Sequence, residues 1–150
     1  MLLGNSVSFV MTTDRLVTVD VTDRMSTACR LLSAGSIHHL PVLDGNKLVG
    51  IISTTDLLRA GIGIDADEDE SPVLDVGQDE LDEALDIEGV MEKRLVTLHP
   101  KDTLRRAAEL FAEASFNSLP VVDEEGELIG ILTMRDLLRY ILAADSGRAG

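Results

Sequence analysis

Apolar and polar positions follow one order along the first half of this chain. Residues 16–19 form a short apolar run typical of a strand, and residues 25–32 carry apolar side chains at helical spacing. Two more apolar runs, 37–43 and 48–52, flank the turn Asp44-Gly45-Asn46. A helix is expected from Ser53 or Thr54 to Arg59. The pattern therefore predicts the order β-α-β-β-α.

The same order returns about 80 residues later. Strands are expected at 95–98, 116–122 and 128–132, and helices at 104–111 and 133–142. The spacing is 79 residues between Leu16 and Leu95, and 80 between Leu48 and Leu128, because the second turn carries one extra residue. A repeat that survives a small insertion indicates a duplicated structural unit. Such copies usually bury their cores against each other.

This spacing divides the chain into a first repeat over residues 10–60, a linker over 61–89 and a second repeat over 90–143. Residues 1–11 are a weakly patterned lead-in. No apolar run approaches 18 residues and no signal peptide is recognisable, so we expect a soluble, cytoplasmic protein without a membrane partner. The single cysteine, Cys29, lies in an apolar helical stretch and is expected to be a buried structural thiol.

Charge changes this picture mainly in the linker. The net charge is −14, and twelve acidic residues but no Lys or Arg lie between Asp65 and Glu88. We interpret this run as a solvated linker in which residues 79–86 can form one or two helical turns. A tether that screens a cleft from anions is the alternative. The acidity disfavours nucleic acid as a partner. Ten Arg against three Lys on an acidic protein also suggest a halophilic source.

One motif occurs in both repeats at the end of an expected strand: Gly, two apolar residues, Ser or Thr, two residues and Asp. The copies are Gly50–Asp56 and Gly130–Asp136. A helix N-terminus with a hydroxyl can bind a phosphate or sugar oxygen, and an Asp one turn later can accept hydrogen bonds from a ribose diol. The alternative is that Ser53 and Thr133 only cap helices, with the Asp side chains favouring the helix dipole.

Together with Val-Met at 10–11 and 90–91 and Leu-Pro-Val at 40–42 and 119–121, these motifs resemble the CBS-domain family in its tandem form, the Bateman module. The resemblance covers nearly the whole chain outside the acidic run. It implies an α+β fold of two β-α-β-β-α repeats packed sheet to sheet with pseudo-twofold symmetry. It also implies clefts between the repeats that bind AMP, ADP, ATP or S-adenosylmethionine.

The resemblance further implies a role for each motif. Asp56 and Asp136 would hold ribose hydroxyls, Ser53 and Thr133 would bond ribose or phosphate, and Thr18 and Thr97 would line the base or ribose. Backbone groups at His38-His39 and Asn117-Ser118, ahead of Pro41 and Pro120, would contact the adenine edge.

The two copies differ in where basic groups lie. Arg135 precedes the second Asp and can donate two hydrogen bonds to a phosphate, whereas Thr55 precedes the first. The first copy has His38-His39 where the second has neutral Asn117-Ser118. We therefore expect unequal sites, with the first relying on His38 or His39. Adjacent histidines on a strand point to opposite faces and cannot chelate one metal, and either could instead pack at an interface without ligand.

These observations favour a regulatory module that binds an adenosine ligand and signals to an unknown effector protein by a change of shape. No Ser-His-Asp pattern, Cys/His ligand set or Walker-type loop is present, so we expect neither an enzyme nor a metal or cofactor. A structural dimerisation module with empty sites is the alternative. A homodimer is expected, built from the paired leucines Leu57, Leu58, Leu137 and Leu138.

Overall fold

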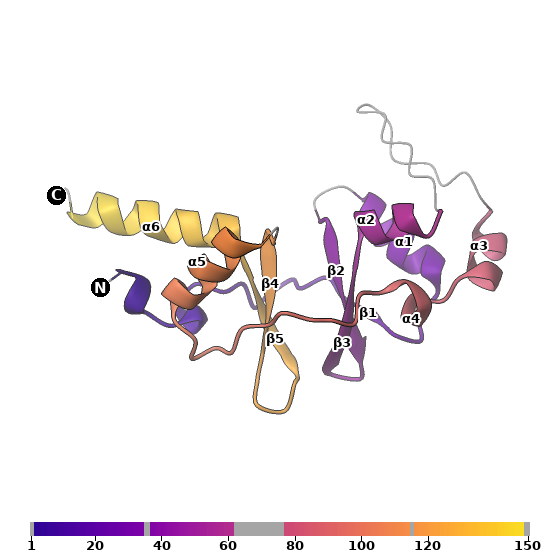
Figure 1. Ribbon diagram of the computed structural model, residues 1–150, viewed down its shortest axis with the longest axis horizontal. Coiled ribbons are helices and arrows are strands. Elements are labelled where there is room, and N and C mark those ends of the chain that lie inside the picture. Colours follow the sequence, from indigo (N-terminus) through magenta and orange to yellow (C-terminus); the bar gives the residue numbers. More distant parts are fainter. Residues whose placement is uncertain (1, 35–36, 62–76, 115, 149–150) are drawn as a thin grey trace. The chain divides into compact units, whose positions relative to one another are not determined.

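The computed structural model describes residues 2–34, 37–61, 77–114 and 116–148 (Figure 1). The chain divides into two compact units. One spans Val17–Leu95 and contains most of the first repeat, and the other joins Met1–Leu16 to Val96–Gly150 and contains most of the second. They are called the first-repeat unit and the second-repeat unit below. Each combines helices with a small sheet, which confirms the α+β class.

The first-repeat unit is built on a three-stranded sheet. Strand β1 (Val19–Asp20) runs parallel to β2 (His39–Asp44), and β2 pairs antiparallel with β3 (Lys47–Ser53). The described part of this unit contains four helices: α1 (Met25–Ser33), α2 (Thr54–Arg59), α3 (Gln78–Ala84) and α4 (Ile87–Val90).

The second-repeat unit repeats this hairpin. Strands β4 (Ser118–Val122) and β5 (Leu128–Thr133) pair antiparallel, and Leu98 forms a parallel bridge to Val121 where β1 pairs with β2 in the other unit. Its helices are the 3-10 turns η1 (Leu2–Gly4) and η2 (Val7–Phe9), followed by α5 (Leu104–Glu113) and α6 (Met134–Arg148).

The first strand of each repeat is shorter than the sequence pattern predicts. Strand β1 covers only Val19–Asp20 instead of 16–19, and only Leu98 of the run 95–98 pairs with the sheet. The chain passes from one compact unit to the other at Leu16–Val17 and at Leu95–Val96. The residues at these crossings are therefore connections, and pairing begins only after the chain has reached the sheet.

Each unit has its own apolar core. Alternate residues of the hairpin point inward, and the first leucine of the pair in the last helix, Leu57 or Leu137, packs against them. Leu57 is fully buried and Leu137 is 5% exposed, so the prediction that these two leucines form a dimer surface is wrong. Their neighbours Leu58 and Leu138 are 58% and 53% exposed.

The buried thiol expected at Cys29 is confirmed, and burial raises its pKa to about 11.

The described part of the acidic segment is packed on the first-repeat unit. Leu81 of α3 and Ile87 of α4 are buried in its core. Asp82 accepts hydrogen bonds from the backbone N–H and the hydroxyl of Ser26, both at 2.8 Å. These bonds serve the first turn of α1, whose own N-cap residue makes no side-chain bond, and they lower the pKa of Asp82. Residues 62–76 of the expected linker lie outside the described residues.

The two units also exchange their lead-in segments. Residues 87–92, which span the start of the second repeat, pack on the first-repeat hairpin, and residues 7–12, which span the start of the first repeat, pack on the second-repeat hairpin. Glu92 exchanges two backbone hydrogen bonds with Ile51 (3.1 and 2.8 Å), and Thr12 exchanges two with Ile131 (2.8 and 2.9 Å).

Each exchanged segment packs closely against a glycine of the hairpin. A Cβ placed on Gly50 would lie 2.3 Å from the sulfur of Met91, and one on Gly130 would lie 2.9 Å from the sulfur of Met11 and 3.0 Å from the carbonyl of Thr12. Any larger residue would force the methionine side chain to shift, and at Gly130 the backbone of the segment as well. The glycine that opens each motif is therefore needed for packing and need not contact a ligand.

We predict that Gly50→Ala destabilises the protein by about 1–3 kcal/mol, because the added methyl group overpacks the contact with Met91. For a chain of this size that corresponds to a loss of about 2–4 °C in melting temperature per kcal/mol. Calorimetric melting measures the change. Gly147→Ala is the matched control, since a Cβ there meets nothing within 4 Å. Equal melting temperatures for wild type and Gly50→Ala would show that the methionine yields without cost.

Candidate functional site

The first motif ends in a reciprocal cap at the start of α2. Ser53 is the N-cap, and its hydroxyl oxygen accepts a hydrogen bond from the backbone N–H of Asp56 at 3.1 Å. In return, Oδ2 of Asp56 accepts from the backbone N–H of Ser53 at 2.8 Å and from its hydroxyl at 2.9 Å. This capping box fixes the rotamer of the carboxylate.

The second motif has the same geometry. The backbone N–H of Asp136 donates to Thr133 Oγ1 at 2.9 Å, and Thr133 N–H donates to Asp136 Oδ2 at 3.1 Å. A third residue joins here: the hydroxyl of Thr12, on the exchanged segment, donates to Asp136 Oδ2 at 3.3 Å. Each residue of 51–60 is also buried, half-buried or exposed like its counterpart in 131–140.

The two interpretations of the motif are therefore compatible. Ser53 and Thr133 do cap their helices, and each Asp is half-buried at the first turn. All the hydrogen bonds found on these carboxylates among the described residues reach Oδ2. Oδ1 of each group keeps its acceptor capacity in a fixed position, which is what a pair of vicinal hydroxyls requires.

Half of the predicted site residues lie in each unit. Each of them is buried or exposed in the same way as its counterpart in the other unit. In both units the motif Ser or Thr is half-buried, the proline of the preceding strand is buried, and the residue directly before the motif Asp is exposed. The first-repeat unit contains Thr18, His38, His39, Pro41, Ser53, Thr55 and Asp56, and the second-repeat unit contains Thr97, Asn117, Ser118, Pro120, Thr133, Arg135 and Asp136.

The backbone carbonyl three residues before each proline already accepts a hydrogen bond. The carbonyl of His38 accepts from Thr54 N–H at 3.3 Å, and that of Asn117 accepts from Met134 N–H at 2.8 Å. These bonds hold the start of each hairpin against the start of the following helix. A carbonyl oxygen has a second lone pair, so this geometry still permits contact with a ligand.

His39 is a poor source of positive charge. It is half-buried at the start of β2, and desolvation, together with the neighbouring His38, lowers its pKa, against the opposing effect of Asp56. The ring is therefore largely neutral at pH 7 and can serve as a hydrogen-bonding group. His39 pairs with Ser53 across the hairpin, which places it beside the motif.

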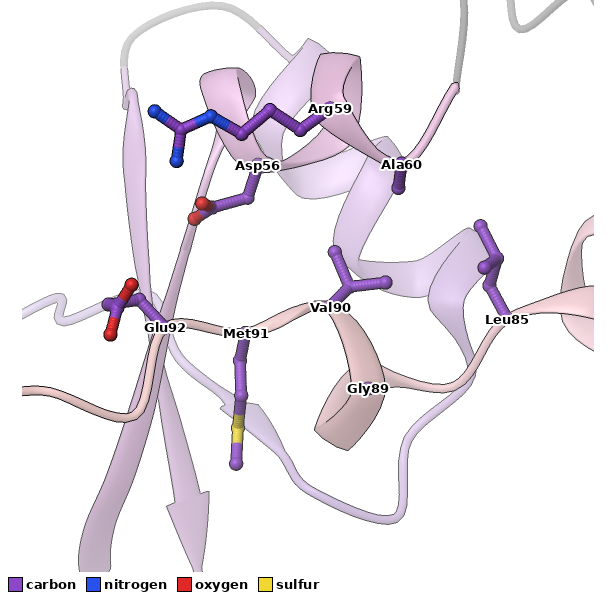
Figure 2. A pocket seen from close by; sticks show the side chains of 8 residues that line it. All are labelled: Asp56, Arg59, Ala60, Leu85, Gly89, Val90, Met91 and Glu92. Carbon is purple, nitrogen blue, oxygen red and sulfur yellow. The ribbon is translucent and has the colours of Figure 1, made fainter.

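A pocket of about 430 Å³ opens beside Asp56 within the first-repeat unit (Figure 2). Figure 2 shows the carboxylates of Asp56 and Glu92 and the guanidinium of Arg59 directed toward the same end of it. The other end is lined by small and apolar groups. The full lining is Asp56, Arg59, Ala60, Leu85, Gly89, Val90, Met91 and Glu92.

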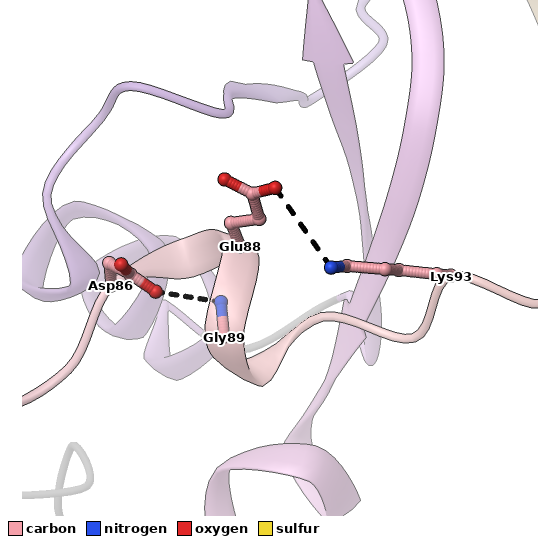
Figure 3. Close-up of polar contacts among 4 residues, drawn as sticks. All are labelled: Asp86, Glu88, Gly89 and Lys93. Atoms are coloured by element: carbon pink, nitrogen blue, oxygen red, sulfur yellow. Dashed lines mark hydrogen bonds and ion pairs between the residues drawn. The ribbon is translucent and has the colours of Figure 1, made fainter.

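Helix α4 forms one wall of this pocket and is held by polar contacts of its own. Asp86 caps it by accepting from Gly89 N–H at 2.7 Å, and a Cβ on Gly89 would lie 2.8 Å from the same oxygen (Figure 3). Glu88 forms an ion pair with Lys93 at 3.9 Å on the exposed side of the helix. The cap and the ion pair lie in the helix and the short segment that lead to and flank Glu92.

Three residues beside the motifs were missed by sequence reasoning: Thr12, Glu92 and Arg59. The first two belong to lead-in segments that pack on the opposite repeat, and Arg59 was predicted only as the last residue of a helix. A signal for the first two did exist. Val10-Met11 and Val90-Met91 recur at the repeat spacing of 80, so the residue after each methionine is also an equivalent position.

No helix within the described ranges is long and apolar enough to cross a membrane.

The profile of the CBS domain family matches this chain twice, over residues 7–63 and 84–143. A CBS domain-containing protein of Dictyostelium discoideum is 32% identical over 131 residues, covering 85% of each chain. An inosine-5'-monophosphate dehydrogenase of Korarchaeum cryptofilum is 32% identical over 122 residues, which are 81% of this chain but only 21% of the dehydrogenase.

Among solved structures, the chain is similar to CBSX2 of Arabidopsis thaliana, a CBS-pair protein solved in complex with AMP. The TM-score is 0.74 at 29% identity, and the match covers 95% of this chain and 99% of CBSX2. The two profile matches contain both Gly50–Asp56 and Gly130–Asp136. This chain belongs to the CBS domain family, as a tandem pair of CBS domains.

Proposed function

We propose that this protein is a regulatory module that binds an adenosine-containing ligand, with ribose hydroxyls accepted by Asp56 and Asp136. The observation that carries the proposal is the matched geometry of the two carboxylates. Each is fixed through Oδ2 by the helix cap while Oδ1 keeps its acceptor capacity. The complex of CBSX2 with AMP supports the ligand class. AMP, ADP, ATP and S-adenosylmethionine are the candidate ligands, and no resident cofactor is proposed.

The output of such a module is conformational. A ligand that prefers one arrangement of the chain shifts the population toward it, and an effector protein responds to that shift. We propose binding and not catalysis, in the cytoplasm. The rival function is a structural dimerisation module with empty sites, which the fixed carboxylates disfavour.

We predict that Asp56→Asn combined with Asp136→Asn weakens binding of AMP or the other adenosine ligands by about tenfold or more. A hydrogen bond to a charged group contributes about 1.5–3 kcal/mol, and Asn keeps an oxygen for the helix cap while losing the charge. Isothermal titration calorimetry measures the affinity. Asp44→Asn, an exposed aspartate at the end of β2, is the control.

Replacing AMP by 2'-deoxy-AMP tests the same contact from the ligand side. The wild type should lose affinity for the deoxy ligand, whereas the double variant should bind both equally weakly. Undiminished binding of AMP by the double variant would remove the ribose assignment.

The lowered pKa of His39 gives a prediction for pH dependence. The unfolded chain binds a proton near pH 6.5, but the folded chain binds it only at lower pH, so unfolding takes up a proton below pH 6.5. The stability of wild type should therefore fall as the pH decreases from 6.5, and His39 should contribute no change above it. His39→Gln should reduce that slope in denaturant titrations at pH 5.5 and 7.0. NMR titration of the His39 ring gives the direct check, and a midpoint above 6.5 would contradict it.

We also propose a homodimer formed through α2 and α6. Leu58 and Leu138 occupy matching positions and are both more than half exposed, so each leaves apolar surface that a second copy of the chain can cover. Leu58→Asp with Leu138→Asp should convert a species of twice 16.2 kDa into monomers in light scattering. The control is Val17→Asp with Val96→Asp, another matched pair of exposed residues. A dimer that survives the leucine changes but not the valine changes would place the interface elsewhere.

A further inference from the structure

Glu92 and Thr12 occupy the same position in the two units but have different charge. Each follows the methionine of a lead-in segment, and each exchanges two backbone hydrogen bonds with the isoleucine after the motif glycine, Ile51 or Ile131. The Thr12 hydroxyl reaches Asp136, and the Glu92 side chain lines the pocket with Asp56. One unit therefore presents a neutral donor at this position and the other presents a carboxylate.

Glu92 is oriented by a backbone hydrogen bond, and the base next to it in sequence is paired with another residue. Its Oε1 accepts a hydrogen bond from Arg94 N–H at 2.8 Å, and Lys93, the neighbour in sequence, is paired with Glu88 (Figure 3). The charged residues that line the pocket are Asp56, Glu92 and Arg59, and their charged groups lie at the same end of it (Figure 2). The formal charge of this pocket is −1.

The corresponding positions of the second-repeat unit carry the opposite balance. Asp136 is the only carboxylate among them, Thr12 replaces Glu92, and Arg139 matches Arg59. Arg135 stands where the first unit has Thr55. Asp136 and Arg139 cancel at the positions that match the pocket lining, and Arg135, whose counterpart Thr55 does not line the first pocket, brings the sum beside Asp136 to +1.

The two sites also differ in the room beyond the carboxylate. The first-unit pocket is lined by Ala60 and Leu85, whose counterparts at the repeat spacing of 80 are Tyr140 and Asn5. The Asn5 side-chain amide donates to the Tyr140 hydroxyl, so these two residues join across the corresponding space. A bulky 5' substituent therefore has more room beside Asp56 than beside Asp136.

We infer that the Asp56 site selects adenosine ligands whose 5' substituent is uncharged or cationic, a thioether or a sulfonium, and that Glu92 excludes 5'-phosphates from it. This rests on the proposed binding of ribose by Asp56. A phosphate placed in this pocket would meet a lining of net charge −1, in which Glu92 forms no ion pair among the described residues. A neutral thioether meets no such repulsion, and a sulfonium is attracted. The Asp136 site, with its two arginines, accepts the phosphorylated ligand.

The test isolates the first site by placing Asp136→Asn in the background. Calorimetry at pH 7.5 compares AMP, adenosine, 5'-methylthioadenosine and S-adenosylmethionine. We expect 5'-methylthioadenosine to bind about tenfold more tightly than AMP, and Glu92→Gln to bring the two affinities within about threefold of each other. Glu88→Gln is the matched control, because it removes the same charge from an exposed side chain of the same segment that does not line the pocket. It should leave the preference unchanged.

The reciprocal exchange tests the second site. In an Asp56→Asn background, Thr12→Glu should weaken AMP by about tenfold and affect 5'-methylthioadenosine little. If Asp56-dependent binding prefers AMP, or if Glu92→Gln leaves a preference for the thioether intact, the inference is wrong while the proposed function stands. If none of the four ligands binds in a way that requires Asp56, both are wrong. Melting curves of each variant establish that it is folded.

Discussion

The close approach of a methionine to a glycine organises each half of this protein. Met91 lies on Gly50 and Met11 on Gly130, and in both cases the next residue pairs through two backbone hydrogen bonds with the strand that carries the glycine. The segment that precedes one repeat thereby completes the core of the other. Val7 and Ile87, which are fully buried, are the clearest signs of this, since each is covered by the hairpin of the opposite repeat. Neither repeat can form its complete core from its own residues.

The same constraint builds the candidate sites. Because the exchanged segment pairs at a fixed register, the residue after each methionine is delivered to the carboxylate that ends the motif. This is why Thr12 bonds Asp136 and why Glu92 shares a pocket with Asp56. The helix caps hold the carboxylates in place. The exchanged segments supply the side chain beside each carboxylate, Thr12 or Glu92. Stability and recognition therefore depend on one set of backbone contacts.

Much of the fold follows from local pattern in the sequence. Alternation and turn residues place β2, β3, β4 and β5 within a residue or two, and the doubled motif identifies Asp56 and Asp136 at helix starts. The extent of the first strands could not be predicted, because pairing there depends on where the chain crosses between units. Packing of Leu57 and Leu137 was also missed, since two adjacent leucines on a short helix do not show which one faces inward.

The roles of Thr12, Glu92 and Arg59 depend on distant contacts. The recurring Val-Met pair marks Thr12 and Glu92 as equivalent positions, but it does not show that each segment packs on the opposite repeat. Asp82 is similar: within an acidic run it has the pattern of a solvated side chain, yet it accepts two hydrogen bonds from Ser26. A long-range cap requires only one correctly placed oxygen, and composition cannot reveal it.

Comparison of the two copies separates packing from recognition. Positions that pack in both units keep their character: Val7 and Ile87, Met11 and Met91, Gly50 and Gly130, Leu57 and Leu137. Positions that border the carboxylates differ in size or charge: Thr12 and Glu92, Ala60 and Tyr140, Thr55 and Arg135. A purely structural dimerisation module would have no physical reason to place its differences there. Buried contacts tolerate little change in volume, so they hold both copies to one fold, while the borders of each carboxylate are free to acquire different ligands.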